Sequence, residues 1–294
     1  MIVPSNFNKL LEPGLRKIWG DTYTLYPEQY SKVFNVESTS RAWEEDQQIV
    51  GGGLTPEKPI GRGIEYLQMY QGFTKRYSML TYGKGFIVAR ELLEDDLYRK
   101  IAQLPKEHAK DNIRTVEILS ANILNRAFNS SFVGGDGVAL CSASHPIIGG
   151  TFTNLLPTAD LDITSFEEAL LMIAALVDGA GMKVMVKPRQ LVIHPSNEFM
   201  AQYILKSERL PDTVNNNYNP AKGLIPYTVM NYLTDDDAWF IQTDISNGLN
   251  FFWRRRPEFS TENDFDTENA RFKTTFRCDV SWTDPRCVVG SAGA

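Results

Sequence analysis

The sequence predicts an α+β protein, and three observations support this prediction. Runs rich in aromatic and β-branched residues are expected to end the chain as a strand and a basic turn at 249–259, a long strand at 272–282 and a short strand at 289–291. Alternating helix and strand patterns in the middle third indicate a separate α/β lobe. Between the arm and this lobe, a long amphipathic helix is expected to end near residue 128, because apolar side chains recur at helical spacing: Ile113, Val116, Leu119, Ile123, Leu124 and Ala127.

Composition and charge fit an ordinary soluble protein. The 294 residues are 43% hydrophobic and 11% aromatic, enough for a sizeable core in one or two domains. Thirty Lys and Arg against 36 Asp and Glu give a net charge of −6, without the basic excess that tight nucleic-acid binding needs. A basic cluster at residues 254–256 is predicted to be a solvated turn, although it could touch a phosphate backbone.

The cysteines and the apolar segments indicate the compartment. Cys141, Cys278 and Cys287 are odd in number and irregularly spaced, so they predict buried thiols in a reducing compartment and no zinc site. Residues 1–20 lack the apolar core of a signal peptide, and the apolar run 169–177 is too short to span a bilayer. The sequence therefore predicts a soluble cytoplasmic protein without membrane contact, metal or cofactor.

Residues 1–43 are predicted to form an arm, because their aromatic side chains show no long helical or strand period. These aromatics need a covering surface, which belongs either to the same subunit or to a neighbouring one. They are Phe7, Trp19, Tyr23, Tyr26, Tyr30, Phe34 and Trp43.

The segment from Trp43 to Arg90 is predicted to contain a projecting hairpin. Glycines and prolines break up this segment before strand-like runs at 64–70 and 73–82, and its polar start buries little apolar area. Because an isolated two-stranded hairpin is marginally stable in water, a long one is expected to lie on another body. The alternative is a surface loop without a partner.

The next segments contain strand and helix signals in turn. Residues 86–89 are predicted to be a short buried strand, and acidic residues after Arg90 suit the first turn of a helix. Pro105 is expected to kink or split the long helix, because proline removes a backbone donor.

In the lobe, Ser165 is expected to cap a helix, residues 191–194 to form a buried strand and residues 198–207 a second helix. His194 is predicted to be structural, because no second metal ligand stands at a suitable spacing. Residues 213–223 are predicted to be an exposed loop.

A crowded segment raises the question of catalysis. Cys141, Ser142, Ser144 and His145 stand together after a glycine cluster, and a hydrolase needs a nucleophile and a histidine. The Gly-x-Ser-x-Gly pattern of a nucleophile elbow and the glycine patterns that bind phosphate are both absent. The cluster is therefore predicted to be a turn, with a Cys/His hydrolase centred on Cys141 and His145 as an alternative.

Several segments resemble a known family. Residues 140–146 (Leu-Cys-Ser-Ala-Ser-His-Pro) resemble the segment that follows the spine helix in tailed-phage major capsid proteins. Residues 90–95, 219–223, 238–241 and 256–259 resemble other landmarks in the same order, so the likeness runs from about residue 85 to the end. The chain thus resembles major capsid proteins of the Hong Kong phage capsid fold, closest to the Mu-like head-subunit family.

This resemblance implies a domain plan. Residues 1–43 correspond to the N-terminal arm and residues 44–85 to the extended loop. Residues 86–160 and 247–294 correspond to the peripheral domain with its spine helix and C-terminal strands. Residues 161–246 correspond to the axial domain.

The resemblance also implies a structural protein without catalytic residues, whose copies form hexamers and pentamers of an icosahedral head around double-stranded DNA. It would be assembled in the host cytoplasm, become part of the virion and contact DNA non-specifically, with scaffold, portal and decoration proteins as possible partners. An encapsulin-type nanocompartment shell is the alternative within this fold. The expected subunit-contact residues are Trp43, Lys58, Arg62 and Tyr66 in the hairpin and Asn215, Asn216 and Asn217 in the axial loop.

Overall fold

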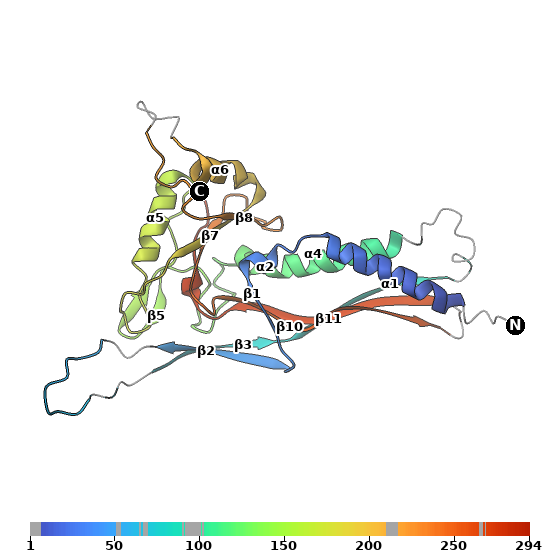
Figure 1. Cartoon of the computed structure of the whole chain (residues 1–294), viewed down its shortest axis with the longest axis horizontal. Helices are drawn as coiled ribbons and strands as arrows, with labels where there is room; N and C mark the ends of the chain where they lie inside the picture. Colours follow the sequence, from blue (N-terminus) through green and yellow to red (C-terminus); the bar gives the residue numbers. More distant parts are fainter. Residues whose placement is uncertain are drawn as a thin grey trace.

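The computed structural model describes residues 7–50, 54–64, 66, 70–89, 91, 101, 103–209, 217–264, 267 and 269–294. These residues form an elongated peripheral part, a lobe at one of its ends, and a hairpin beneath the junction of the two (Figure 1). Two four-stranded sheets organise the molecule. Among the described residues, every helix falls short of the length and hydropathy that crossing a membrane demands.

The peripheral part is a sheet covered on one face by helices. Its strand order is β1-β10-β11-β4, with bounds Asn35–Ser38, Leu249–Asn263, Ala270–Trp282 and Leu80–Val88. Along β11, buried Phe272, Thr274 and Phe276 alternate with more exposed neighbours, as expected for a sheet with one buried face. Helices α1 (Phe7–Leu25) and α4 (Gln103–Asn125) lie above that buried face (Figure 1).

The predicted C-terminal strands are confirmed, but the basic turn between them is wrong. Residues 254–256 lie inside β10, where register shifts between Trp253 and Arg255 and between Arg255 and Glu258 interrupt the pairing with β11. Such bulges bend a strand without ending it. The three basic residues are therefore part of a long strand.

The arm contains a helix that the sequence did not indicate. Pro13 lies inside α1, although an interior proline normally disfavours a helix. Leu15 and Trp19 are buried against Phe259 and Phe272 of the sheet, so packing supports the helix where local propensity does not. The buried aromatic side chains of the arm are therefore covered by residues of the same subunit.

Helix α4 confirms the predicted amphipathic helix and ends at Asn125. Pro105 stands in its first turn, where a missing backbone N–H costs no helical hydrogen bond, and it does not split the helix. The helix start predicted after Arg90 lies outside the described residues, apart from Glu91.

The second half of the arm joins the peripheral part to the lobe. Helix α2 (Tyr30–Val33) begins at the carboxylate of Glu117 on α4, which accepts the backbone N–H groups of Gln29 at 2.7 Å and Tyr30 at 3.1 Å. Two glutamine side chains of the lobe, Gln190 and Gln242, donate to the carbonyl groups of Lys32 and Val33 at 2.9 and 2.7 Å. This part of the arm is thus built into its own subunit.

Burial raises the pKa of Glu117 above its ordinary value, despite the two backbone N–H groups that favour the carboxylate. Its contribution to stability is therefore fully present below the unfolded-state pKa and is lost as pH rises through the folded-state pKa. We expect Glu117→Gln, which cannot ionise, to gain stability relative to the parent between about pH 4 and pH 7, by about 1.4 kcal/mol per unit of pKa difference. Urea unfolding at both pH values measures this. Exposed Glu107 on the same helix provides the control Glu107→Gln, and a pH-independent difference for Glu117→Gln would refute the argument.

The lobe is a second sheet with helices packed on it. Its strand order is β12-β9-β7-β8, with bounds Val288–Ser291, Trp239–Thr243, Pro188–Ile193 and Tyr227–Val229. Helices α5 (Ile163–Ala174) and α6 (Glu198–Lys206) share its core, which includes Phe166, Ile204 and Trp239. The predicted strand and both helices are confirmed, but Asp162 is the N-cap of α5 and Ser165 completes its capping box.

Two further expectations for the lobe concern single residues. His194 caps the short 3-10 helix Pro195–Asn197, where its ring accepts the N–H of Ser196, which is the structural role predicted for it. In the predicted exposed loop, Asn219 is instead fully buried and donates to the carbonyl groups of Ile204 and Ser207 at the end of α6.

Candidate assembly surface

The hairpin consists of β2 (Trp43–Val50) paired with β3 (Tyr70–Ser78). The predicted strand at 64–70 is wrong for Ile64 and Tyr66, which lie outside any strand. The predicted strand at 73–82 divides at Met79, where the chain leaves β3 and enters β4 of the peripheral sheet.

The root of the hairpin is anchored on its own subunit. The Asp46 carboxylate accepts hydrogen bonds from Thr283 at 2.7 Å and Asn247 at 2.9 Å. Tyr77 is fully buried, and its hydroxyl lies 2.8 Å from that of Thr283. The expectation that this segment projects as a hairpin is therefore wrong for its root.

Two glycines form the seat of this root. A Cβ atom at Gly135 would lie 2.8 Å from the carbonyl oxygen of Thr74, and one at Gly179 would lie 2.6 Å from a methyl group of Val50. Backbone and side chain of the hairpin therefore approach these positions more closely than any larger residue permits. The glycine cluster at 134–137, predicted only as a turn, also supports the hairpin.

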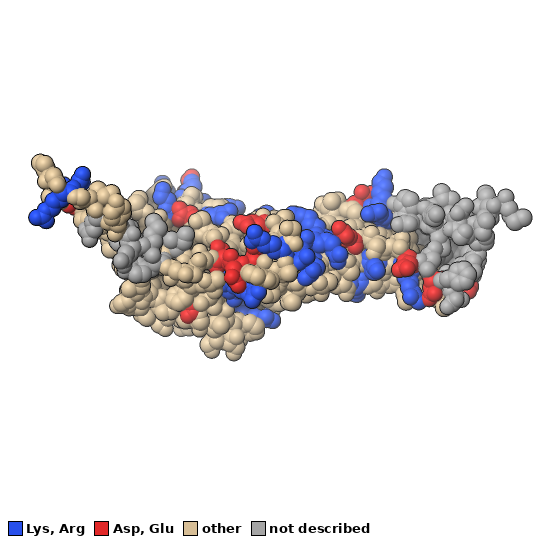
Figure 2. All heavy atoms as spheres, turned by 90° about the horizontal axis from the view of Figure 1, so that it is seen from below, with Lys and Arg blue, Asp and Glu red and all other residues tan. Residues whose placement is uncertain are grey.

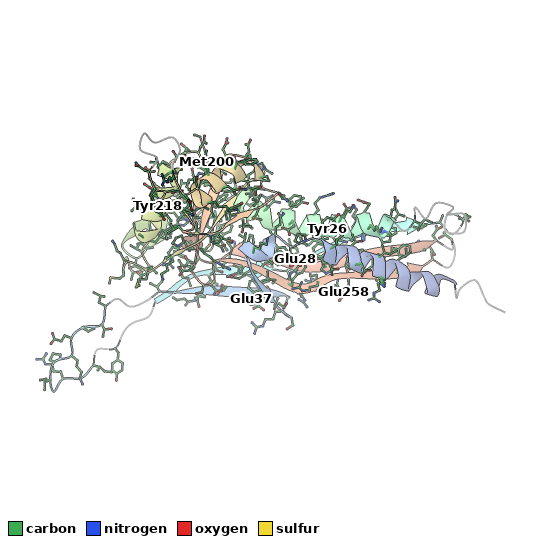
Figure 3. The ribbon with its side chains drawn as sticks, turned by 45° about the horizontal axis from the view of Figure 1, so that its top comes forward. Tyr26, Glu28, Glu37, Met200, Tyr218 and Glu258 are labelled. Carbon is green, nitrogen blue, oxygen red and sulfur yellow. The ribbon has the colours of Figure 1, made fainter. Side chains whose placement is uncertain are left out.

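The tip of the hairpin, defined here as residues 54–64 and 66, projects beyond the body (Figure 3). Four of its apolar side chains are exposed, and Ile60 is completely so. The other three are Leu54, Ile64 and Tyr66. Isolated exposed apolar residues are common, but four on one short projection mark a surface that a partner can cover.

The structure does not bring all the predicted contact residues together. Lys58, Arg62 and Tyr66 are exposed on the tip. Trp43 lies at the root, 45% exposed, with the Arg76 guanidinium 4.1 Å from its ring centre. Asn217 is exposed on the lobe, whereas Asn215 and Asn216 lie outside the described residues.

The lower face of the molecule carries charges of both signs. Figure 2 shows Lys and Arg gathered near the middle of this face with Asp and Glu between them. Several of the exposed charges on the hairpin and on the peripheral sheet are paired: Arg76 with Glu45 at 3.7 Å, Arg255 with Glu258 at 4.0 Å, and Arg271 with Asp264. Such a mixed surface suits contact with another protein surface of mixed charge better than a continuous phosphate backbone.

The lobe exposes apolar side chains that the sequence reasoning missed. Phe199 on α6 is 84% exposed and Leu171 on α5 is 71% exposed. Met200 and Tyr218 also lie on the outside of the lobe (Figure 3). The sequence signal for this exposed surface was Phe199. It lies outside the apolar stripe of α6 that faces the core, which consists of Ala201, Ile204 and Leu205.

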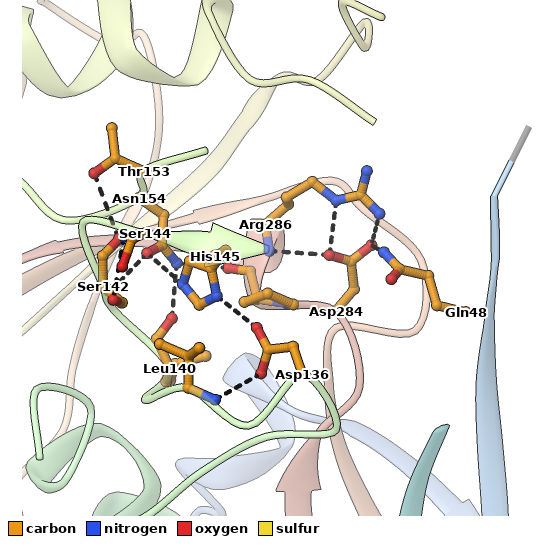
Figure 4. A network of polar contacts seen from close by, with 12 residues as sticks. Gln48, Asp136, Leu140, Ser142, Ser144, His145, Thr153, Asn154, Asp284 and Arg286 are labelled. Carbon is orange, nitrogen blue, oxygen red and sulfur yellow. Dashed lines mark hydrogen bonds and ion pairs between the residues drawn. The ribbon is translucent and has the colours of Figure 1, made fainter. Parts of the chain in front are cut away.

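The cysteine and histidine of the crowded segment do not form a reactive pair. Cys141 is 2% exposed within the main core, and burial raises the pKa of its thiol, which keeps it protonated. Both ring nitrogens of His145 face other groups: Asp136 at 2.6 Å and Asn154 at 2.9 Å (Figure 4). This geometry contradicts the Cys/His hydrolase alternative.

We expect Cys141→Ala to remain folded and to cost about 1 to 2 kcal/mol, as a small core truncation does. In the native parent protein, thiol reagents should leave all three buried cysteines unmodified, and unfolding in urea should expose them to rapid labelling. Mass spectrometry after a labelling pulse measures both states. Rapid native labelling of Cys141 alone would indicate an activated thiol.

Comparison with protein families gives one match. A family model described as "Phage capsid protein" matches residues 72–291, which is well over half of the chain. No curated protein sequence matches the chain.

Solved structures resemble the fold at low sequence identity. The procapsid of bacteriophage JBD30 matches with a TM-score of 0.56 and 15% identity, covering 99% of this chain and 76% of that chain. The capsid of Ralstonia phage GP4 matches with a TM-score of 0.55 and 12% identity, covering 89% and 87%. A virus-like particle from Pyrococcus furiosus matches with a TM-score of 0.57 and 12% identity, covering 94% and 97%. These likenesses show a shared fold.

Proposed function

The chain belongs to the phage capsid protein family, and from this we propose that its copies assemble as hexamers and pentamers into an icosahedral head around double-stranded DNA. The chain is a structural major capsid protein with the phage major capsid fold, as the resemblance in its sequence predicts. Closeness to the Mu-like head subunits stays a prediction, because the family model covers phage capsid proteins in general.

The assembly proposal rests on the hairpin, whose root is anchored on its own subunit and whose tip is exposed. Asp46 and Tyr77 hold the root on its own subunit, while the apolar tip residues find no cover there. A projection of this kind can reach a different surface on the next copy, and such head-to-tail contacts close into rings when the rotation permits. We assign Lys58, Arg62 and Tyr66 to this contact.

The remaining assignments follow the family plan. Residues 1–43 are assigned to the arm, 44–85 to the extended loop, 86–160 and 247–294 to the peripheral domain, and 161–246 to the axial domain. Two of these bounds need correction, because β4 already begins at Leu80 in the peripheral sheet and β12 (Val288–Ser291) pairs in the sheet of the lobe. Asn215 to Asn217 are assigned to contacts around the symmetry axes. Scaffold, portal and decoration proteins and the packaged DNA are proposed partners, and the protein is proposed to reside in the virion after assembly in the host cytoplasm.

A nanocompartment shell enclosing protein cargo is the second candidate. The particle from Pyrococcus furiosus supports it through its fold alone. The family match favours the phage head, since it covers most of the sequence, whereas the particle shares only 12% identity.

Electron microscopy and light scattering of the purified protein test the proposal. We expect rings of five or six subunits or closed shells, with scaffold supplied where the phage encodes one. Monomers or dimers at every protein and salt concentration would contradict it. Nuclease-protected DNA in shells formed during infection would separate the head from a cargo compartment.

A further inference from the structure

The amide group of Asn154 has one orientation that satisfies its surroundings. Its Nδ2 lies 2.7 Å from the Leu140 carbonyl oxygen, 2.8 Å from that of Pro285 and 3.0 Å from that of Val288. Its Oδ1 accepts the backbone N–H of Ser142 at 2.8 Å. A flipped amide would turn its oxygen toward three carbonyl oxygens and its NH₂ toward an N–H donor. The group that faces His145 is therefore an oxygen.

This orientation fixes the protons of His145. Its Nε2 lies 2.9 Å from Asn154 Oδ1, and an amide oxygen only accepts, so Nε2 carries a hydrogen. Its Nδ1 lies 2.6 Å from Asp136 Oδ2, whose other oxygen accepts the Val138 N–H at 3.2 Å. The side chains of His145 and Asp136 are only 1% and 4% exposed, so their contact is shielded from water. A buried ion pair is favourable only when both partners also have their remaining hydrogen bonds.

We propose that His145 is protonated on both ring nitrogens in the native protein and that Asp136, His145 and Asn154 form a proton-dependent lock against the root of the hairpin. The lock joins three parts of the chain. Asp136 belongs to the glycine cluster on which β3 rests, His145 begins the small strand His145–Ile147, and Asn154 holds the segment that enters β12 (Figure 4). It lies where the two sheets and the hairpin root meet, so it couples the hairpin seat to the end of the chain.

Loss of one proton breaks this arrangement. A neutral imidazole has one N–H, so either Asp136 or Asn154 would face a bare nitrogen across a buried contact. The charged groups nearby do not replace it. Lys75 donates to the Val133 carbonyl at 3.1 Å and acts on Asp136 only through its charge. Arg286 lines the same cavity as Asp136, but its guanidinium donates to the Asp284 carboxylate at 2.6 and 2.8 Å.

Nuclear magnetic resonance of the nitrogen-15-labelled imidazoles tests the protonation state directly. The chain has three histidines, which keeps the spectrum simple. At neutral pH we expect both His145 nitrogens to show the signals of protonated nitrogen. His108 provides the internal reference for a neutral ring, because burial lowers its pKa. A neutral His145 with one bare nitrogen would overturn the proposal.

Hydrogen exchange tests the coupling to the hairpin. Asp136→Asn removes the countercharge, and we expect amides of residues 71–75 to exchange about tenfold faster or more, the equivalent of one lost hydrogen bond to a charged group. His194→Gln, which changes a histidine outside the lock, should leave them unchanged. Unchanged exchange in Asp136→Asn would refute the coupling.

The dependence on pH separates His145 from Lys75. In the parent protein, exchange of these amides, corrected for its intrinsic pH dependence, should accelerate when a rise in pH removes the proton. In His145→Gln this acceleration should be absent. If it persists there, Lys75 or another group causes it and the lock is not proton-dependent. Should a variant fail to fold, the spectrum of the parent protein still decides the protonation state.

Discussion

Asn154→Asp should destabilise the folded subunit by about 3 to 5 kcal/mol, a large part of the 5 to 15 kcal/mol that typically separates folded from unfolded protein. The substitution keeps the size of the side chain but turns an oxygen toward the carbonyl groups of Leu140, Pro285 and Val288. Each of these buried acceptors then loses its donor, and such a loss costs about 1 to 3 kcal/mol. Asn154 is completely buried, so water cannot compensate.

Guanidinium unfolding of unassembled subunits measures this change. The matched control is Asn129→Asp, because Asn129 is exposed and its side-chain oxygen accepts the Ser131 N–H, which an aspartate also does. We expect the control to stay within about 0.5 kcal/mol of the parent. An Asn154→Asp variant as stable as this control would show that the hydrogen bonds of the Asn154 side chain do not stabilise the fold.

The sequence was sufficient for elements whose signal is local. The β-branched and aromatic runs of β10 and β11 and the apolar stripe of α4 specify their type through side chains a few positions apart. Helix α1 was not predicted, because the residues that stabilise it by packing, Phe259 and Phe272, are far along the chain. Locally, Pro13 argued against a helix. Residues 254–256 looked like a turn because an exposed strand face can be as charged as a loop.

The site depends still more on distant partners. Asn154 meets carbonyl groups 131 and 134 positions further along, and Glu117 meets the backbone N–H of a residue 88 positions earlier. No periodicity marks such pairs. The segment around His145 drew attention for its nucleophile and base, yet its role depends on Asp136 and Asn154, each nine positions away on opposite sides. Subunit-contact residues are harder to predict than the residues of this network, because the sequence of a single chain does not show which exposed residues a second copy covers.

Removing the hairpin tip should abolish assembly and leave the subunit folded. Val50 and Tyr70 are paired across the hairpin, so residues 51–69 can be replaced by Asn-Gly, which closes a two-residue turn between paired strands. The deletion spares Asp46, Tyr77 and the seat at Gly135, so we expect the unfolding free energy of the free subunit to change by less than about 1 kcal/mol.

The reason for the assembly defect is that the tip's apolar side chains gain cover only from a neighbouring copy. A full-length variant, Ile60→Asp, tests this without shortening the chain, because Ile60 is completely exposed and a charge there leaves the free subunit undisturbed. Burying that charge in an interface would cost several kcal/mol, so shells should fail to form or fall apart on dilution. Light scattering and electron microscopy measure assembly, and limited proteolysis should cut the tip in free parent subunits and spare it in shells. Normal shells from both variants, with equal cleavage of the parent's tip in both states, would show that the hairpin does not join subunits.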